Sequence, residues 1–216
     1  MVLNGDKTKL MIFNETRNFQ FSTRKYINEN VLQIMNQTKL LGLILSNDLT
    51  TKSNTTNLVK KGYQRMIILH KLYEFNIPLQ DMVQIYCLFV RSILEFNAVV
   101  WFASISEEEK SDLERVQKVA CKILLKQKYT TYENAQITLK IENLQTRRLK
   151  MALKFGKKCL VSPQFSKLFP LNQKTFTETR DREKYKVNFA NKSRLKNSAI
   201  PKIQRLLNDD ARGIKL

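Results

Sequence analysis

Two rows of positively charged side chains are the feature of this sequence best suited to hold a ligand. Both rows have intervals of three, four and four residues: Arg115, Lys118, Lys122 and Lys126, then Arg147, Lys150, Lys154 and Lys158. At these intervals side chains share one face of an α-helix. Each row therefore places four cations on one side of a helix, and two parallel rows predict a groove that follows a phosphate backbone.

The alternative interpretation of each row is a solvated helix face, because long cationic side chains commonly cover the outside of a helix. Repetition of the same intervals on a second helix favours binding. Three further cations, Lys60, Lys61 and Arg65, lie on the polar side of an earlier predicted helix, and we include them in the predicted nucleic-acid surface.

The charge of the chain points to the same kind of partner. The 38 Lys and Arg residues against 19 Asp and Glu give a formal net charge of +19. The charge is uneven: residues 1–139 carry 18 basic and 13 acidic side chains, and residues 140–216 carry 20 and 6. A compact protein with this much like charge repels itself unless a polyanion lies nearby, so nucleic acid is the first partner to consider. The alternative is a basic surface that only confers solubility.

Metal and nucleophile chemistry find little support. The three cysteines, Cys87, Cys121 and Cys159, are far apart and form no CxxC pair, which favours reduced thiols in an intracellular protein of the nucleus or cytoplasm. The single histidine, His70, has no partner ligands at metal spacing, so we expect a helix-surface residue, no metal site and no cofactor. We expect no secretory signal and no membrane segment.

Five segments have the periodicity of helices. The stretch Met82–Trp101 is apolar at three- and four-residue intervals and on most sides, so we expect one central helix with neighbours all round. Helices are also predicted from about residue 53 to 75, from 106 to about 127, over the second basic row up to Ser162 and Pro163, and over 200–207. Ser106 and Glu109 have the spacing of a capping box.

The first 50 residues look different. The apolar runs Leu10–Phe13 and Leu40–Leu45 are short and separated by polar residues, which suggests buried strands in a small antiparallel sheet. A sheet of so few strands has little to cover its second face, so this region is expected to be the end of a larger domain.

The predicted fold class is therefore mainly α. We expect a small antiparallel β piece over residues 1–50, a helical bundle over 51–162, and a basic, partly ordered C-terminal tail over 163–216. In that tail, Tyr185, Val187 and Phe189 alternate with polar and charged residues, which suggests an extended segment whose aromatic rings stack on bases, or a loosely ordered basic tail.

Several stretches, in linear order, resemble the reverse transcriptases of non-LTR (LINE-type) retrotransposons. The opening LNGDKTKLMIF resembles the end of the polymerase palm, with Gly5 in place of the usual proline, and LLGLIL resembles the LG hairpin of the primer grip. The stretches KKGYQRMIILHKLYEFNIP, YCLFVRSILEFNAVVWF and SEEEKSDLERVQKVACKIL resemble the helical thumb. LKFGKKCL, TRDREKYKV and RLKNSAIPKIQRLLN are similar to the C-terminal end of these enzymes, so the resemblance covers essentially the whole chain.

The resemblance implies roles for single residues. Lys7 matches a palm lysine proposed to protonate the leaving pyrophosphate, with a surface lysine in a turn as its alternative. Leu41 and Gly42 match the primer-grip hairpin, where the missing side chain of glycine lets the backbone approach the primer terminus. Their alternative is a buried strand with a glycine kink. The partner that the resemblance implies is an RNA/DNA hybrid or RNA, together with the palm and fingers of such an enzyme.

One departure from the family bears directly on catalysis. The family holds catalytic Mg²⁺ with palm aspartates that include a YxDD pair, and this sequence contains no YxDD. Asp209 and Asp210 follow Asn208 near the other end of the chain. Two-metal nucleotidyl transfer needs carboxylates that converge on one point, so we expect no catalysis by this chain, and Mg²⁺ only in an intact polymerase of the family.

Residues 39–75 also resemble the short N-terminal module of an AlkB-homologue tRNA-modifying enzyme. With His70 as the only histidine, the iron ligands of such a dioxygenase are not present. The alternative to a nucleic-acid-binding protein is therefore a helical module that binds a protein partner through an exposed apolar face, without nucleic-acid specificity.

Overall fold

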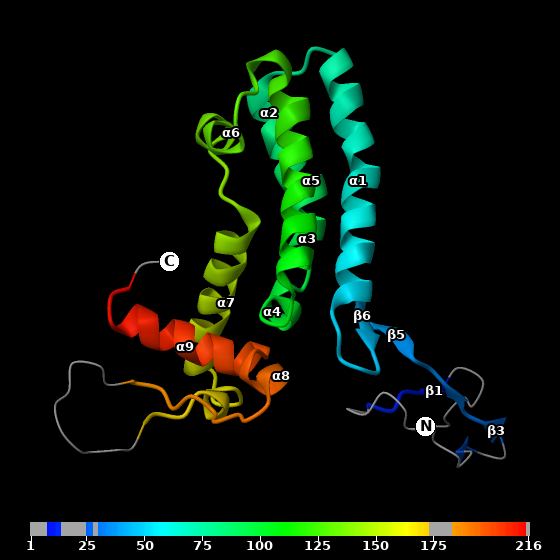
Figure 1. Ribbon diagram of the computed structural model, residues 1–216, viewed down its shortest axis with the longest axis vertical. Helices are drawn as coiled ribbons and strands as arrows, with labels where there is room; N and C mark the ends of the chain where they lie inside the picture. Colours follow the sequence, from blue (N-terminus) through cyan, green and yellow to red (C-terminus); the bar gives the residue numbers. More distant parts are fainter. Residues whose placement is uncertain (1–7, 14–24, 28–29, 173–182, 215–216) are drawn as a thin grey trace. The chain divides into compact units, whose positions relative to one another are not determined.

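The computed structural model describes residues 8–13, 25–27, 30–172 and 183–214, in two compact units, Met1–Asn57 and Leu58–Leu216. The fold is mainly helical, with a small antiparallel sheet near the N-terminus, as the sequence predicts (Figure 1). The interval 163–216 belongs to the second unit. Among the described residues, no helix has both the length and the apolar character needed to span a bilayer.

The described residues of the first unit form three pairs of short strands. β1 (Lys9–Leu10) pairs in parallel with β4 (Gln33–Ile34), and two antiparallel pairs join β2 (Tyr26–Ile27) to β3 (Asn30–Val31) and β5 (Gln37–Leu40) to β6 (Leu43–Ser46). The prediction of a buried strand over Leu10–Phe13 is wrong, because the strand ends at Leu10 and the side chain of Phe13 is 53% exposed.

The β5–β6 hairpin turns at Leu41 and Gly42. Both residues have positive φ, 47° and 85°, as a two-residue type I′ turn requires. Glycine adopts this conformation without a steric penalty, so Gly42 allows the chain to reverse within two residues. A hairpin therefore forms where the alternative interpretation expects a single kinked strand. The side-chain oxygen Oδ1 of Asn54 accepts a hydrogen bond from the backbone N–H of Ile44 in β6, at 3.3 Å.

Helix α1 (Lys52–Glu74) corresponds to the helix predicted from about residue 53 to 75. Its close approach to the rest of the second unit depends on Gly62. A Cβ atom at this position would lie 2.9 Å from Val116 Cγ1 and 3.0 Å from Leu94 Cδ2, closer than ordinary van der Waals contact. A larger residue here would push α1 away from its neighbours.

The predicted central helix is broken into several segments. It runs through α2 (Leu79–Ile85), the π-helix η2 (Tyr86–Arg91) and α3 (Ser92–Leu94), and α4 (Ala98–Trp101) follows a break. The prediction of one helix as far as Trp101 is wrong because Asn97 is left-handed, with φ of 51°. Asparagine is one of the few residues other than glycine that adopt this conformation readily.

The π-helix follows from the spacing of the buried side chains. Met82, Tyr86, Val90 and Leu94 are all buried, at strict four-residue intervals. In an α-helix of 3.6 residues per turn each such step turns about 40° too far, so the set would wind away from the core. The wider turns of the π-helix reduce this drift and keep the four side chains on the core side.

The opposite side of the same segments is open. The exposed fractions of Leu88, Phe89, Phe96 and Val100 are 68%, 46%, 45% and 57%. The prediction of neighbours all round is therefore wrong: four large apolar side chains of this stretch face outward.

Helix α5 (Glu107–Leu125) begins with the predicted capping box, which is confirmed. The Ser106 hydroxyl accepts a hydrogen bond from the Glu109 amide at 3.2 Å, and Glu109 Oε2 accepts from the Ser106 amide at 2.8 Å. Helix α6 (Tyr132–Leu139) follows the 3₁₀ turn η3 (Lys126–Lys128). Helix α7 (Leu144–Val161) also begins at a side-chain cap, because Asn143 Oδ1 accepts a hydrogen bond from the Thr146 amide at 2.7 Å.

The end of the chain packs on α7. After the 3₁₀ turn η4 (Ser166–Leu168), the short α8 (Ser193–Lys196) leads into α9 (Ala199–Ala211), which crosses α7 (Figure 1). Gly156 lies at this crossing: a Cβ there would be 2.6 Å from Ile203 Cγ2. The core of this region includes Phe102, Phe169 and Tyr185.

Two amide side chains of α9 form hydrogen bonds to the backbone of the segments beside it. Asn208 accepts a hydrogen bond from the Tyr185 amide at 2.8 Å and donates one to the Tyr185 carbonyl at 2.9 Å. One turn earlier, Gln204 donates to the Leu168 carbonyl at 2.9 Å and accepts from the Asn188 amide at 3.0 Å. Tyr185 is thus buried in the core, which is incompatible with the stacking on bases that its spacing suggested.

Candidate nucleic-acid interface

Part of the second basic row surrounds an open hollow of about 670 Å³ on α7. Four lysines and two apolar residues line it: Lys150, Lys154, Lys157, Lys158, Leu153 and Val161. Lys150 is paired with Glu142, and Lys157 Nζ lies 2.8 Å from Asp210 Oδ2. Lys154 and Lys158 form no ion pair within the part of the chain that the structure describes, so two exposed cations at this surface are available for a ligand.

Arg147, the first member of that row, is used differently. Its guanidinium forms two hydrogen bonds to the carboxylate of Glu95, one of them 3.0 Å from Nη2 to Oε2. The side chains are 28% and 11% exposed, and the hydrogen bonds to Glu95 raise the pKa of Arg147. Arg147 thus joins α7 to the end of α3, and Lys157, which the spacing did not select, lines the hollow with Lys154 and Lys158.

The first basic row, on α5, is largely engaged with its own surroundings. Arg115 is paired with Asp112 at 2.9 Å. Lys118 and Lys122 lie over the rings of Tyr132 and Tyr129, with Nζ 5.2 Å and 5.6 Å from the ring centroids. These stacked ammonium groups remain exposed, and such contacts are worth about 0.5–1 kcal/mol at exposed sites.

Lys126 does not continue the first row. Helix α5 ends at Leu125, and Lys126 has φ of 44°, which turns its side chain away from the helical progression. Its Nζ lies 3.1 Å from the ring centroid of Tyr73 on α1. The predicted four-residue row is therefore a row of three, followed by a lysine that contacts another helix.

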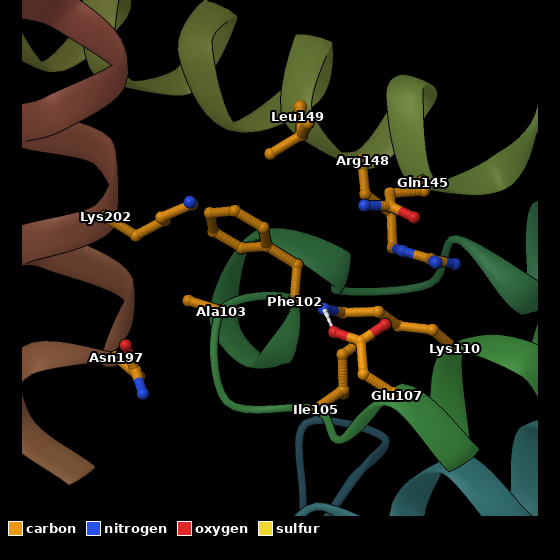
Figure 2. A pocket seen from close by; sticks show the side chains of 10 residues that line it. All are labelled: Phe102, Ala103, Ile105, Glu107, Lys110, Gln145, Arg148, Leu149, Asn197 and Lys202. Carbon is orange, nitrogen blue, oxygen red and sulfur yellow. Dashed lines mark hydrogen bonds and ion pairs between the residues drawn. The ribbon is translucent and has the colours of Figure 1, made fainter. Parts of the chain in front are cut away.

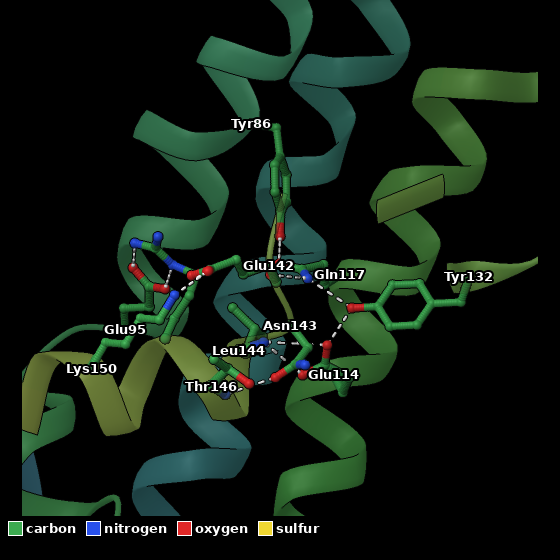
Figure 3. Close-up of polar contacts among 11 residues, drawn as sticks. Tyr86, Glu95, Glu114, Gln117, Tyr132, Glu142, Asn143, Leu144, Thr146 and Lys150 are labelled. Atoms are coloured by element: carbon green, nitrogen blue, oxygen red, sulfur yellow. Dashed lines mark hydrogen bonds and ion pairs between the residues drawn. The ribbon is translucent and has the colours of Figure 1, made fainter. Parts of the chain in front are cut away.

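A buried hydrogen-bond network fixes the helix below this row (Figure 3). The Tyr86 hydroxyl donates to Gln117 Oε1 at 2.7 Å, and Gln117 Nε2 donates to the Tyr132 hydroxyl at 2.7 Å and to the Glu142 carbonyl at 2.9 Å. Tyr132 in turn donates to Glu114, whose carboxylate also accepts from the Leu144 amide at 3.1 Å. The network ties α5 to η2, to α6 and to the start of α7.

Burial and the neighbouring acid keep the tyrosines of this network protonated. Burial raises the pKa of Tyr86 well above its ordinary value, with a smaller contribution from Cys121. Burial, followed by the hydrogen bond to Glu114, raises the pKa of Tyr132. Both hydroxyls are therefore hydrogen-bond donors within the core rather than acids or bases for a reaction.

The remaining predicted residues belong to other elements of the chain. On α1, Lys60 is exposed and Lys61 is half-buried, while Arg65 donates to the Phe89 carbonyl of the π-helix at 2.9 Å. Leu41 and Gly42 form the turn in the first unit, with Leu41 87% exposed. Lys7 lies outside the described residues. Among the predicted residues that the structure describes, Lys150, Lys154 and Lys158 of α7 line one hollow together.

One charged residue that the sequence analysis missed is Arg148. It is 2% exposed, and its two terminal guanidinium nitrogens have no hydrogen-bond partner among the residues that the structure describes. Its Cζ is 5.9 Å from the ring centroid of Trp101. Burial lowers the pKa of Arg148, and Glu114 and Glu95 oppose this effect through space.

The sequence does contain a signal for Arg148. Ala152 and Gly156, at intervals of four, are buried on α7, and Arg148 continues the same spacing one step back. A charged residue within a buried stripe is uncommon and often has a specific partner.

The described residues contain free thiols and lack a cluster of metal ligands. All three cysteines are free, Cys121 and Cys159 are buried, and burial, with a smaller contribution from Glu114, raises the pKa of Cys121 to about 12. Among the described residues, no three His, Cys, Asp or Glu side chains lie together as a metal site would require. His70 is exposed on α1, as predicted.

Comparison with known proteins adds no relative. No family model matches this chain, and no curated protein and no solved structure matches it.

Proposed function

We propose that this chain binds the phosphate backbone of a nucleic acid through the lysine-lined hollow of α7, without catalysis of its own. The observation that carries the proposal is the pair Lys154 and Lys158, which are exposed, form no ion pair within the described residues, and share the hollow with two further lysines. Fixed cations on one face of a helix bind phosphates without regard to base sequence.

The class of nucleic acid is proposed from the sequence resemblance. The thumb of a non-LTR reverse transcriptase holds the template-primer, so an RNA/DNA hybrid or RNA is the proposed ligand, in the nucleus or the cytoplasm. The α5 row would contribute less, because its arginine is paired and its lysines lie over tyrosine rings. The palm and fingers of a polymerase are the proposed protein partner.

A salt titration of binding to a short RNA/DNA hybrid tests this function. We expect the logarithm of the association constant to fall linearly with the logarithm of salt concentration, and we expect Lys154→Gln with Lys158→Gln to lower the slope by about 0.7–0.9 for each lysine. Hybrids of different sequence should respond alike. Fluorescence anisotropy at four salt concentrations measures both quantities.

The matched control is Lys167→Gln, which removes one charge from an exposed lysine of η4 outside the hollow. It should leave the slope almost unchanged. An unaltered slope in the Lys154/Lys158 double variant would remove the hollow from the proposal, and a salt-independent association constant would remove backbone binding altogether.

A second candidate function is a protein-interaction module. It is favoured by the outward-facing side chains Leu88, Phe89, Phe96 and Val100, because clustered apolar side chains on a surface mark binding sites for proteins. Sedimentation velocity without nucleic acid tests it. Association that grows with protein concentration and is lost in Leu88→Glu would support this candidate, and a monomer at all concentrations would count against it.

A further inference from the structure

A cavity of about 340 Å³ lies between α4, α7, α9 and the start of α5 (Figure 2). Its charged residues come from three helices: Arg148 from α7, Lys110 and Glu107 from α5, and Lys202 from α9. Phe102, Leu149 and Ile105 form an apolar part of its wall. The cavity is separate from the lysine-lined hollow, and no residue lines both.

The unsatisfied guanidinium of Arg148 is the central observation. Figure 2 shows its side chain reaching from α7 past Gln145 toward the side where Lys110 and Glu107 lie. Both terminal nitrogens are buried and donate to no acceptor in the structure. An unpaired buried charge costs several kcal/mol, so a native protein is expected to supply it with an anion.

The nearby acids do not fill this role. Glu107 is engaged with Lys110, whose Nζ lies 2.6 Å from its Oε1. Glu114 and Glu95 affect Arg148 through space only, and they accept hydrogen bonds from Tyr132 and Arg147. Lys202 forms no ion pair within the described residues. With the Glu107–Lys110 pair neutral, Arg148 and Lys202 leave two uncompensated positive charges at the cavity.

We infer that this cavity is a binding site for a phosphate-class oxyanion, with the buried guanidinium of Arg148 as its principal partner. The ammonium of Lys202, which Figure 2 shows on the other side of the Phe102 ring, adds positive charge to the same cavity. A planar guanidinium matches two oxygens of a phosphate, and an ammonium supplies a further point charge. The volume is that of roughly ten waters at about 30 Å³ each, so the site also has room for a small group attached to the phosphate. The inference does not depend on the proposed nucleic-acid binding.

Thermal unfolding with inorganic phosphate as the probe tests the site. At constant ionic strength, replacing chloride with phosphate should raise the melting temperature of the full chain in a saturable way. Arg148→Met should weaken the apparent phosphate affinity about tenfold or more. Without phosphate the same variant should be at least as stable as the parent, because a buried unpaired charge has been removed.

A matched variant separates site binding from general charge effects. Lys167→Met removes one exposed lysine far from the lining residues in sequence and should respond to phosphate like the parent chain. If Arg148→Met does not fold, Lys202→Met provides the second test, with loss of the ³¹P line broadening that the parent chain causes as its readout. Equal phosphate responses in the parent and in the folded Arg148→Met or Lys202→Met variant would overturn the inference.

The source of the phosphate is found by a further comparison. A 5′-phosphorylated dinucleotide that stabilises the chain where its 5′-hydroxyl counterpart does not would assign the site to a strand end. Stabilisation by inorganic phosphate alone would assign it to the free ion, and both outcomes support an oxyanion site. No stabilisation by either phosphate compound, relative to chloride, would overturn it.

Discussion

Helices α5 and α7 carry cationic rows with identical intervals, yet the two rows have different environments. On α5 the arginine pairs with a neighbouring acid and the lysines lie over tyrosine rings, whereas on α7 the lysines border a hollow. The intervals determine which side chains share a face. What that face contacts is decided by residues far away in the sequence, so equal spacing does not imply equal availability for a ligand.

The inner faces of the two helices differ as well. Helix α5 buries Gln117, an uncharged amide with all of its described polar contacts satisfied, while α7 buries Arg148, a charged group without an acceptor. The hydrogen bonds of Gln117 hold the inner face of α5 in one arrangement, whereas Arg148 on the inner face of α7 obtains its hydrogen-bond partner, by our inference, from a bound anion.

The largest predicted effect is a difference in the free energy of unfolding between variants at the first residues of the two rows, Arg147 and Arg115. Arg147→Met should lower the free energy of unfolding by about 2–3 kcal/mol, because it leaves the largely buried Glu95 carboxylate without its partner. Arg115→Met, at the exposed pair with Asp112, should cost less than about 1 kcal/mol. Urea denaturation measures both. Equal losses would mean that the two ion pairs are not distinguished by burial.

Gln117→Leu should cost about 2 kcal/mol. The substitution removes the acceptor of the fully buried Tyr86 hydroxyl and one donor to Tyr132, and an unsatisfied buried group costs about 1–3 kcal/mol. Gln145→Leu, at an exposed position of α7, is the control and should change stability by less than about 0.5 kcal/mol. A stable Gln117→Leu variant would show that the network contributes little.

Alkaline pH provides a comparison of the two buried thiols. Because the pKa of Cys121 in the folded chain is about 12, above its ordinary value of 9.0, the folded state keeps this proton to higher pH. Its contribution to the free energy of unfolding is complete below pH 9 and is lost as the pH rises toward 12.

Burial also raises the pKa of Cys159, without a second cause. Cys121→Ala should therefore flatten the alkaline loss of stability more than Cys159→Ala. Urea denaturation at pH 8, 9 and 10 gives the slopes, and identical slopes in the two variants would contradict the difference.

The smallest predicted effect concerns the two close approaches. Gly156→Ala should destabilise the chain by about 1 kcal/mol, since overpacking costs about 1–3 kcal/mol and the gain in helix propensity returns about 1. Gly62→Ala, where the nearest atom is 2.9 Å rather than 2.6 Å away, should cost less. Thermal melts of the two variants measure the difference, and a stabilised Gly156→Ala variant would show that α9 shifts easily.

The sequence predicts the helices well because periodicity and caps are local. The capping box at Ser106 and the end of α7 before Ser162 both follow from neighbouring residues. The break at Asn97 was missed because apolar spacing continues through it, and the exposed face of Leu88 was missed because apolarity alone does not reveal whether a neighbour exists.

The site was only partly predictable for a related reason. Spacing identified Lys154 and Lys158, but the pairing of Arg147 with Glu95 joins residues 52 positions apart and leaves no local trace. Arg148 was hidden for the opposite reason: beside Arg147 it resembles another surface cation, and only its four-residue relation to Ala152 and Gly156 marks it as buried.

The paired amides on α9 have a further consequence. Gln204 and Asn208, one turn apart, donate hydrogen bonds to backbone carbonyls and accept hydrogen bonds from backbone amides of the neighbouring segments. The helix thus supplies hydrogen bonds of the kind that a neighbouring β-strand supplies in a sheet. A chain shortened before Ala199 would lose these acceptors together with the apolar cover of Phe169 and Tyr185. Helix α9 therefore holds these segments in place, and limited proteolysis should cut beside Phe169 and Tyr185 only after α9 has detached.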